Sequence, residues 1–385
     1  MSNPNLRKLG TTLSLIMSKF TIGNQADTTK GYRNTRISVI TYDTNAKIAA
    51  NFSSINGVND LANVLNGLSA SASQNANLED ALVKAYEVKF NCNDSASCQF
   101  KEDYPRPTAL VLFAAGAIST DISTIERLLL NFYIFAESTL ITVNFNSANQ
   151  ALSNFLNGLT YDDLMGTSEY NYTSSSSTLT RDLEWAMLQA NCYCGELGTN
   201  VMYIDKSNNN RVTKYAECLI MEGWLTEEPN DVFDMCSMDN DKTRTPAYIL
   251  SSEKLKFIQA IWDDHDYYIG LHKNNQSQWV WYNYDRTEFM LSGFSDWGVG
   301  QPNGTDGCVI FDSTNNGNLV WKTITCDTDS TGITNALCQS LACDATNTYC
   351  ITSTGSKKKE KSSSKRLQLK DPKKFIGKKH ARIFA

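Results

Sequence analysis

The distribution of cysteine constrains this chain more than any other feature. Nine of its 11 cysteines lie between residues 192 and 350. Such a density is typical of a module held by disulfide bonds, which persist outside the reducing cytosol. Zinc is the alternative, but structural zinc sites use paired C-x2-C units, and the only close pair here is Cys192-Tyr193-Cys194. The chain has only three histidines for mixed sites, so we favour disulfides.

The expected location is extracellular. Five N-x-[ST] sequons agree with the secretory pathway, although any single one can arise by chance: Asn51, Asn93, Asn171, Asn275 and Asn303. The sequence contains no run of 18 apolar residues, so no membrane-spanning helix is predicted. The first 20 residues do not form a signal peptide, because their apolar stretch is short and no small-residue cleavage site follows. Either the sequence starts late or export takes another route.

The charge is divided between an acidic body and a basic tail. Residues 356–385 carry 12 Lys and Arg against 2 Asp and Glu, which leaves 23 basic and 39 acidic residues in 1–355. An acidic body repels phosphate, so nucleic acid is not an expected partner. Residues 351–385 have little to bury and are expected to be a disordered tail. A nuclear-localisation or heparin-binding role for this tail is the alternative.

Residues 1–190 are expected to form an α/β domain with a parallel sheet. The continuous apolar run 108–116 is typical of a buried parallel strand, and 36–42 and 139–145 are further strand candidates. Strands that alternate with helices indicate a sheet flanked by helices. Helical spacing of apolar residues occurs at 6–22, 61–68, 78–88, 122–132 and 183–189.

Residues 192–350 change character. Aromatic residues and cysteines become frequent, and Gly, Asn and Asp separate short strands. One helix is expected at 252–262. This pattern predicts a loop-rich, disulfide-held α+β domain. Its strand candidates are 267–271, 278–283, 308–311 and 319–326.

The same part of the chain resembles a C-type lectin-like domain, over about residues 192–340. Tyr268-Ile269-Gly270-Leu271 is similar to the WIGL motif of that family, and Trp321 stands five residues before Cys326. The order and spacing of the features make this resemblance specific. The other residues that carry it are Trp279-Val280-Trp281, Gln301-Pro302-Asn303, Cys308 and Cys338.

The resemblance implies a set of disulfides. Two of them are the core bridges Cys308–Cys326 and Cys236–Cys338. The three cysteines at 192, 194 and 218 would belong to an N-terminal hairpin, with one thiol left over. Cys343 and Cys350 would remain to pair with each other. Pairing beyond the two core bridges is not determined by the sequence.

Sugar-binding members of this family hold Ca²⁺ with a Glu-Pro-Asn or Gln-Pro-Asp loop, an acidic residue and an Asn-Asp pair. Here Gln301 and Asn303 occupy the loop, and Asp306 stands two residues before Cys308, but Lys322-Thr323 replaces the Asn-Asp pair. Calcium affinity falls as carboxylates are removed, and Lys322 would repel the ion if it pointed inward. We therefore expect no metal and no cofactor, and a retained calcium ion is the alternative.

Binding without calcium would need an exposed aromatic face, for which Trp297 is the candidate. Trp279 and Trp281 alternate along one strand, and we expect that face to belong to the core. The candidate ligand-binding residues are Gln301, Asn303, Asp306 and Trp297.

Residues 1–190 resemble a von Willebrand factor A domain. The segments RISVITYDTNAKIAANF, NLEDALVKA and RPTALVLFAAG are similar to its second and third strands, the helix after its metal loop, and its central strand. Its first strand and the D-x-S-x-S loop are absent, the loop 74–78 has no Thr, and Ala114-Ala115-Gly116 replaces the usual Asp-Gly. The resemblance therefore implies an incomplete sheet without a Mg²⁺ site. The two-domain combination is similar to secreted nematode C-type lectins, which implies a role in innate immunity.

No motif of a common enzyme class occurs, neither G-x-S-x-G, a P-loop, H-E-x-x-H nor G-x-G-x-x-G. We expect a non-enzymatic extracellular glycoprotein in which residues 192–350 bind a glycan or glycoprotein without the usual calcium. Residues 1–190 would contact a protein partner. The alternatives are a structural adhesion or matrix protein with protein partners only, and an intracellular protein with a functional tail at 351–385.

Overall fold

The computed structural model describes residues 1–71, 73, 76–92, 106–116, 118, 121–136, 138–162, 165–194, 198–223, 232–236, 244–313 and 319–343. The first compact unit is Met1–Asn191, and the second begins at Cys192. The expected disordered tail 351–385 lies outside the described residues, as do Asn93, Cys350 and Gln74. None of the helices in the described ranges is long and apolar enough to cross a membrane.

The first unit is built around a parallel sheet, as its alternating pattern predicts. Strand β4 (Ser138–Asn144) lies between β3 (Thr108–Ala114) and β7 (Asn171–Thr173), and both pairings are parallel. Every residue of β4 is buried, whereas β3 is buried only in part. Successive side chains of a strand point to opposite faces, so Leu140 and Ile141 enter different hydrophobic clusters.

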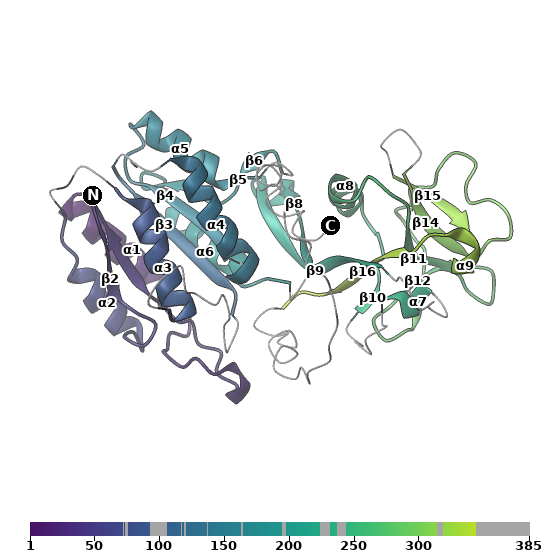
Figure 1. Ribbon diagram of the computed structural model, residues 1–385, viewed down its shortest axis with the longest axis horizontal. Helices are drawn as coiled ribbons and strands as arrows, with labels where there is room; N and C mark the ends of the chain where they lie inside the picture. Colours follow the sequence, from purple (N-terminus) through teal and green to yellow (C-terminus); the bar gives the residue numbers. More distant parts are fainter. Residues whose placement is uncertain are drawn as a thin grey trace. The chain divides into compact units, whose positions relative to one another are not determined.

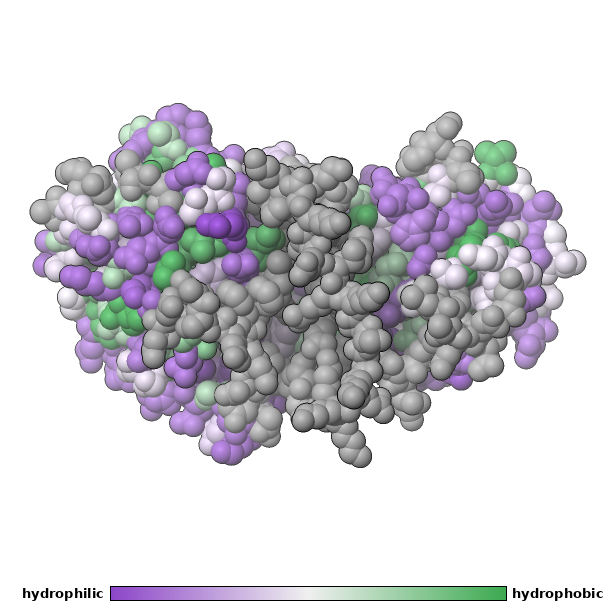
Figure 2. Space-filling view, in the orientation of Figure 1, coloured by the Kyte–Doolittle hydropathy of each residue, from purple (hydrophilic) through white to green (hydrophobic). Residues whose placement is uncertain are grey.

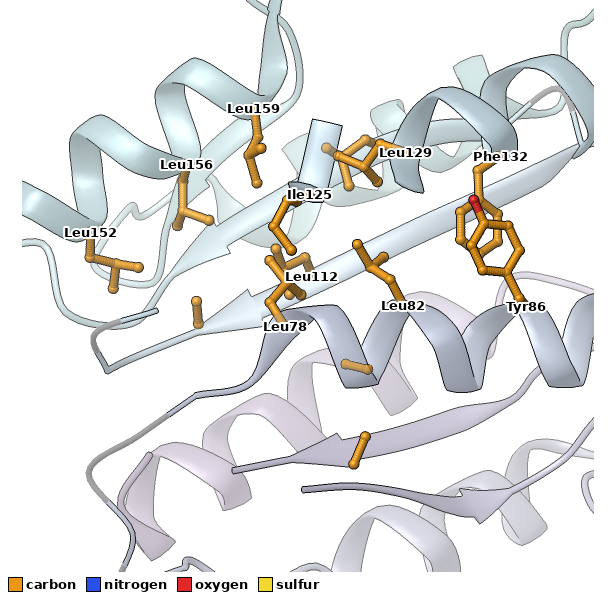
Figure 3. Packing of buried hydrophobic residues seen from close by; sticks show 14 of the residues in the cluster. Leu78, Leu82, Tyr86, Leu112, Ile125, Leu129, Phe132, Leu152, Leu156 and Leu159 are labelled. Carbon is orange, nitrogen blue, oxygen red and sulfur yellow. The ribbon is translucent and has the colours of Figure 1, made fainter. Parts of the chain in front are cut away.

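Helices cover both faces of this sheet (Figure 1). One face packs against α3 (Leu78–Phe90), α4 (Ile122–Ala136) and α5 (Gln150–Thr160), shown in Figure 3. There the ring of Tyr86 stacks on that of Phe132, with 4.2 Å between their centroids. The opposite cluster is formed with α1 (Asn3–Met17), α2 (Val58–Asn66) and α6 (Leu179–Ala190).

Local capping explains where two of these helices begin. The side chain of Asn77 accepts a hydrogen bond from the backbone N–H of Asp80 at the start of α3. Asn149 does the same with the N–H of Leu152 at the start of α5. Such caps satisfy backbone donors that have no partner inside the helix.

Two strands of the first unit stand apart from the parallel sheet. β1 (Val39–Tyr42) and β2 (Ala46–Ala50) form an antiparallel pair of their own. Within the described residues, no backbone ladder joins β1 to β3. A side chain makes the link instead, because Tyr42 Oη donates to the carbonyl oxygen of Phe113 at 3.0 Å. Burial raises the pKa of Tyr42 above its usual range.

The second unit is an α+β domain. Its strands are β8 (Thr199–Asp205), β9 (Arg211–Gly223), β10 (Arg244–Pro246), β11 (Tyr267–Lys273), β12 (Trp279–Tyr282), β13 (Glu288–Met290), β14 (Cys308–Asp312), β15 (Val320–Ile324) and β16 (Asn335–Leu341). They join in one sheet with the main order β13-β12-β11-β16-β9-β8, while β10 pairs with β16, and β14 pairs with β11 and β15. Its helices are α7 (Val232–Met235), α8 (Ser252–Ile261) and α9 (Thr328–Thr331).

Gly270, in the middle of β11, permits a close approach of two backbones. A Cβ atom at this position would lie 2.7 Å from the carbonyl oxygen of Pro246. The N–H of Gly270 instead donates to the carbonyl oxygen of Ala247 at 2.9 Å. This is the physical reason for glycine in the Tyr-Ile-Gly-Leu motif.

Disulfide bonds join parts of the second unit that are distant in the sequence. Cys236 and Cys338 are bonded across 102 residues, and Cys308 and Cys326 across 18 residues, which are the two bridges that the lectin resemblance implies. A third bridge joins Cys194 to Cys218. Cys192 lies outside that bridge, and its Sγ donates to the carbonyl oxygen of Tyr215. Cys92 and Cys343 also take part in disulfides.

The predicted fold class is confirmed. An α/β unit with a parallel sheet is followed by a disulfide-rich α+β unit. On the face shown in Figure 2, hydrophilic residues predominate among the coloured atoms, and hydrophobic residues form separate patches.

Candidate functional site

The loop between β13 and β14, residues 291–307, carries all four candidate ligand-binding residues, and Gln301 is the centre of its hydrogen bonding. Gln301 Oε1 accepts from Thr323 N at 3.0 Å, from Thr323 Oγ1 at 2.7 Å and from Asn303 N at 3.2 Å. The hydroxyl of Thr323 also lies 2.7 Å from the carbonyl oxygen of Asn303. These contacts fasten the loop to β15.

This hydrogen-bond network occupies Gln301 Oε1, the oxygen through which Gln301 would bind a cation. A carboxamide oxygen has two lone pairs, and Gln301 Oε1 already faces three donors. Thr323 is buried, so water does not compete with these bonds. A divalent cation at Gln301 would therefore have to displace internal hydrogen bonds that the folded loop has already made.

Lys322 lies on the other side of the same strand. Its Nζ is 3.1 Å from Oδ2 of Asp312, and its side chain is 45% exposed. Because side chains alternate along β15, the buried Trp321 and Thr323 share one face and Lys322 takes the other. Lys322 would repel calcium only if its side chain pointed into the loop, and it points to the other face of β15.

Asp306 is half-buried in the same loop, two residues before the disulfide-bonded Cys308. Asp296 also lies in the loop, and burial raises the pKa of its carboxyl group. Within the described ranges, no three His, Cys, Asp or Glu side chains come together as a group that could hold a metal ion.

Trp297 belongs to an aromatic cluster and is not a fully exposed platform. Its ring meets that of Trp321 edge to face, with 5.7 Å between centroids. The backbone holds it too, because Gly298 N donates to the carbonyl oxygen of Trp321 at 2.9 Å. Trp281 is fully buried against Trp321, as expected of a core residue.

Trp279 differs from Trp281, since it is partly exposed. Its ring lies 5.1 Å from that of Trp297, and Nζ of Lys273 lies 5.1 Å from its centroid. Lys273 Nζ also donates to the carbonyl oxygen of Gly304 at 3.3 Å. We call Lys273, Trp279 and Trp297 the long-loop aromatic group. Trp279 is therefore not the core residue that its alternation with Trp281 predicts, and the contact of Lys273, which spans 31 residues of chain, has no local signal in the sequence.

The loop also exposes an apolar side chain that is not among the predicted ligand-binding residues. Val299 is completely exposed between Gly298 and Gly300. Gly300 has a positive φ of 80°, which most side chains disfavour. The G-x-G pattern was the available signal for a tight turn that pushes its central residue outward.

In the first unit, Ala114-Ala115-Gly116 stands at the end of β3 in place of the usual Asp-Gly, and its hydrogen bonds are to uncharged groups. The carbonyl oxygen of Ala114 accepts from Phe145 N at 2.7 Å, and that of Ala115 accepts from Asn146 Nδ2 at 3.3 Å. Asn144 donates to the hydroxyl of Ser153 at 2.9 Å. The part of the loop 74–78 before Ala76 lies outside the described residues.

The sequons differ in their surroundings. Asn51, Asn275 and Asn303 are exposed, whereas Asn171 is partly buried in β7. Oδ1 of Asn171 accepts a hydrogen bond from the buried Thr142 at 2.8 Å.

Comparisons with solved structures find C-type lectins. The mouse scavenger receptor C-type lectin carbohydrate-recognition domain is 21% identical, covers 33% of this chain and 90% of its own, and has a TM-score of 0.25. The cow carbohydrate-recognition domain of CD23, solved in the presence of a GlcNAc2Man3 oligosaccharide, is 16% identical, with coverages of 39% and 98% and a TM-score of 0.27. The SPL-1–GlcNAc complex is 20% identical, with coverages of 33% and 88% and a TM-score of 0.25.

Family models identify both parts of the chain. No curated protein matches it. Residues 1–185 match the von Willebrand factor type A domain, and residues 230–340 match the lectin C-type domain. Both resemblances seen in the sequence are thereby confirmed: the chain carries a von Willebrand factor type A domain followed by a lectin C-type domain.

Proposed function

We propose that this chain is a non-enzymatic, extracellular recognition protein whose lectin C-type domain binds a glycan or glycoprotein without calcium. The observation that carries the proposal is the saturation of Gln301 Oε1 by Thr323 and Asn303. A loop whose acceptor is satisfied internally is preorganised without an ion. The three described disulfides support a location outside the cytosol.

The long-loop aromatic group supports a contact that needs no metal. Apolar sugar faces pack on aromatic rings, and the partly exposed Trp279 offers such a ring, with the ammonium group of Lys273 over it. The A domain is proposed as a protein-contact module. Its contact would also work without metal, since Ala114 and Ala115 offer no carboxylate at the end of β3.

The test uses the full chain made in the bacterial periplasm, where disulfides form. Calorimetric titration with Ca²⁺ should give no binding heat, and glycan-array signals should persist in a chelator. Trp279→Ala should lower these signals, whereas Met290→Ala, at an exposed position of β13, should not. A micromolar calcium site would overturn calcium independence. Binding to proteins but to no glycan would favour the adhesion alternative, and reduced cysteines in the native protein would favour the intracellular one.

A further inference from the structure

We propose that Asn303 carries an N-linked glycan which covers the loop 291–307 and so controls access to it. The inference rests on the proposed function, because it places the chain in the secretory pathway and treats this loop as the ligand-binding region. It concerns a covalent modification on the binding loop itself. The sequon Asn303-Gly304-Thr305 overlaps Gln301-Pro302-Asn303 by one residue, and that residue is the acceptor.

The backbone of Asn303 is held while its side chain is exposed. Asn303 N donates to Gln301 Oε1 and lies 3.2 Å from Thr323 Oγ1. Its carbonyl oxygen lies 2.7 Å from the same hydroxyl. The inner contacts of this residue are therefore made by backbone atoms. A sugar attached to Nδ2 can extend into solvent without breaking the network that closes the loop.

The other described sequons provide a contrast. Asn171 uses its side chain inside the fold, since Oδ1 accepts from the buried Thr142, and a glycan there would compete with the packing of β7. Asn51 is exposed but belongs to the first unit. Asn275 is exposed in the turn after β11. Asn303 thus combines an exposed amide with a position inside the candidate site.

The surroundings of Asn303 indicate what a glycan would cover. The next residue, Gly304, accepts a hydrogen bond from Lys273, whose ammonium group lies over the ring of Trp279. The stem of the glycan would begin beside the long-loop aromatic group. An N-linked glycan is bulky, so it would shield this group from large ligands.

The modification is a group transfer from a polyprenyl-pyrophosphate oligosaccharide. The bond between sugar C1 and the pyrophosphate oxygen breaks, and a bond between C1 and Asn303 Nδ2 forms. The amide nitrogen loses a proton, and the lipid pyrophosphate leaves. The transferase of the secretory pathway supplies the catalysis, and this chain supplies only the acceptor sequon.

The experiment expresses the full chain, behind a cleavable leader, in cultured eukaryotic cells. Glycopeptide mass spectrometry reads occupancy at Asn303, and hydroxyl-radical labelling reads the exposure of Trp279 and Val299. Thr305→Ala removes the sequon but leaves Gln301, Asn303 and Thr323 unchanged, whereas Thr305→Ser preserves it. Ser53→Ala removes the sequon of Asn51 as a distant control.

We expect occupancy at Asn303 in the wild type and in Thr305→Ser, and its complete loss in Thr305→Ala. Labelling of Trp279 and Val299 should rise in Thr305→Ala only. An unmodified Asn303 in the wild type overturns the proposal, and so does an occupied Asn303 with unchanged labelling. If occupancy and shielding are found but no variant binds a glycan ligand, the proposed function fails and this inference stands.

Discussion

Lys322 Nζ and Asp312 Oδ2 lie 3.1 Å apart across the hairpin of β14 and β15, so the ammonium group faces away from the candidate loop. The residue that faces the loop is its neighbour, Thr323. The pair Lys322-Thr323 stands where calcium-binding lectins have Asn-Asp, and its Thr323 hydroxyl hydrogen-bonds to Gln301 Oε1. Charge repulsion by Lys322 is therefore not needed to explain the calcium independence that we propose.

Removal of the Lys322 charge should not create a calcium site. We expect Lys322→Met to lower the free energy of unfolding by about 1 kcal/mol, because a partly exposed ion pair is lost. Calorimetric titration with Ca²⁺ should remain flat, since Gln301 Oε1 is still saturated. If this variant gains calcium binding, the ammonium group is what excludes the ion, and our account of the loop is wrong.

Removal of the Thr323 hydroxyl should loosen the loop. Thr323→Val keeps the shape of the side chain but removes the hydroxyl, whose single proton serves either Gln301 Oε1 or the carbonyl oxygen of Asn303. We expect a loss of about 1–2 kcal/mol in the free energy of unfolding. Urea denaturation of protein made in the bacterial periplasm measures it, with the exposed Thr305→Val as the matched control. Equal stability of the two variants would contradict a closing role for Thr323.

The two core disulfides should differ in their effect on stability. They span 102 residues for Cys236–Cys338 and 18 residues for Cys308–Cys326. Chain entropy predicts a loss of about 5 kcal/mol for the long bridge and about 3 kcal/mol for the short one when both cysteines of a pair become alanine. Denaturation of the two double variants measures the difference. A larger loss for the short bridge would show that chain entropy does not set the order of the two effects.

Lys254 should make stability depend on pH. This side chain of α8 is buried, and its Nζ donates to Glu217 at 2.5 Å and to Gln339 at 2.8 Å. Burial lowers the pKa of Lys254 below 10.5, against the opposing effect of Glu217. Between the lowered pKa and 10.5 the unfolded chain binds more protons, so the free energy of unfolding rises with pH.

Lys254→Met removes this contribution. As the pH rises towards about 10, the wild type should gain stability relative to the variant, as read by urea denaturation at each pH. Tyr248 and Tyr284, next to this group, have raised pKa values and would lower stability only at higher pH. Lys256→Met, at an exposed position of the same helix, is the control and should show no such gain. A constant difference for Lys254→Met would contradict a lowered pKa.

Local pattern predicted some elements and missed others. The apolar run 108–116 predicted β3, and the segment 252–262 predicted α8, because burial on one or both faces imposes a periodicity that the sequence displays. The helix α5 was missed, although Asn149 is a cap and Leu152, Leu156 and Leu159 follow at helical spacing. β9 was missed because its pairing partner β16 lies more than 100 residues away, and its half-buried pattern is irregular.

By itself, the sequence determined the order of the two domains, the disulfide-rich character of the second and the residues of the candidate loop. Cysteine density, apolar periodicity and motif spacing indicate these properties, and all three patterns involve residues that are near neighbours in the chain. Only the tertiary structure decided that Thr323 closes on Gln301, that Lys322 turns outward and that Lys273 lies over Trp279. Each of these contacts joins residues that the fold alone brings together, and the direction of a side chain depends on strand register, which local sequence does not determine.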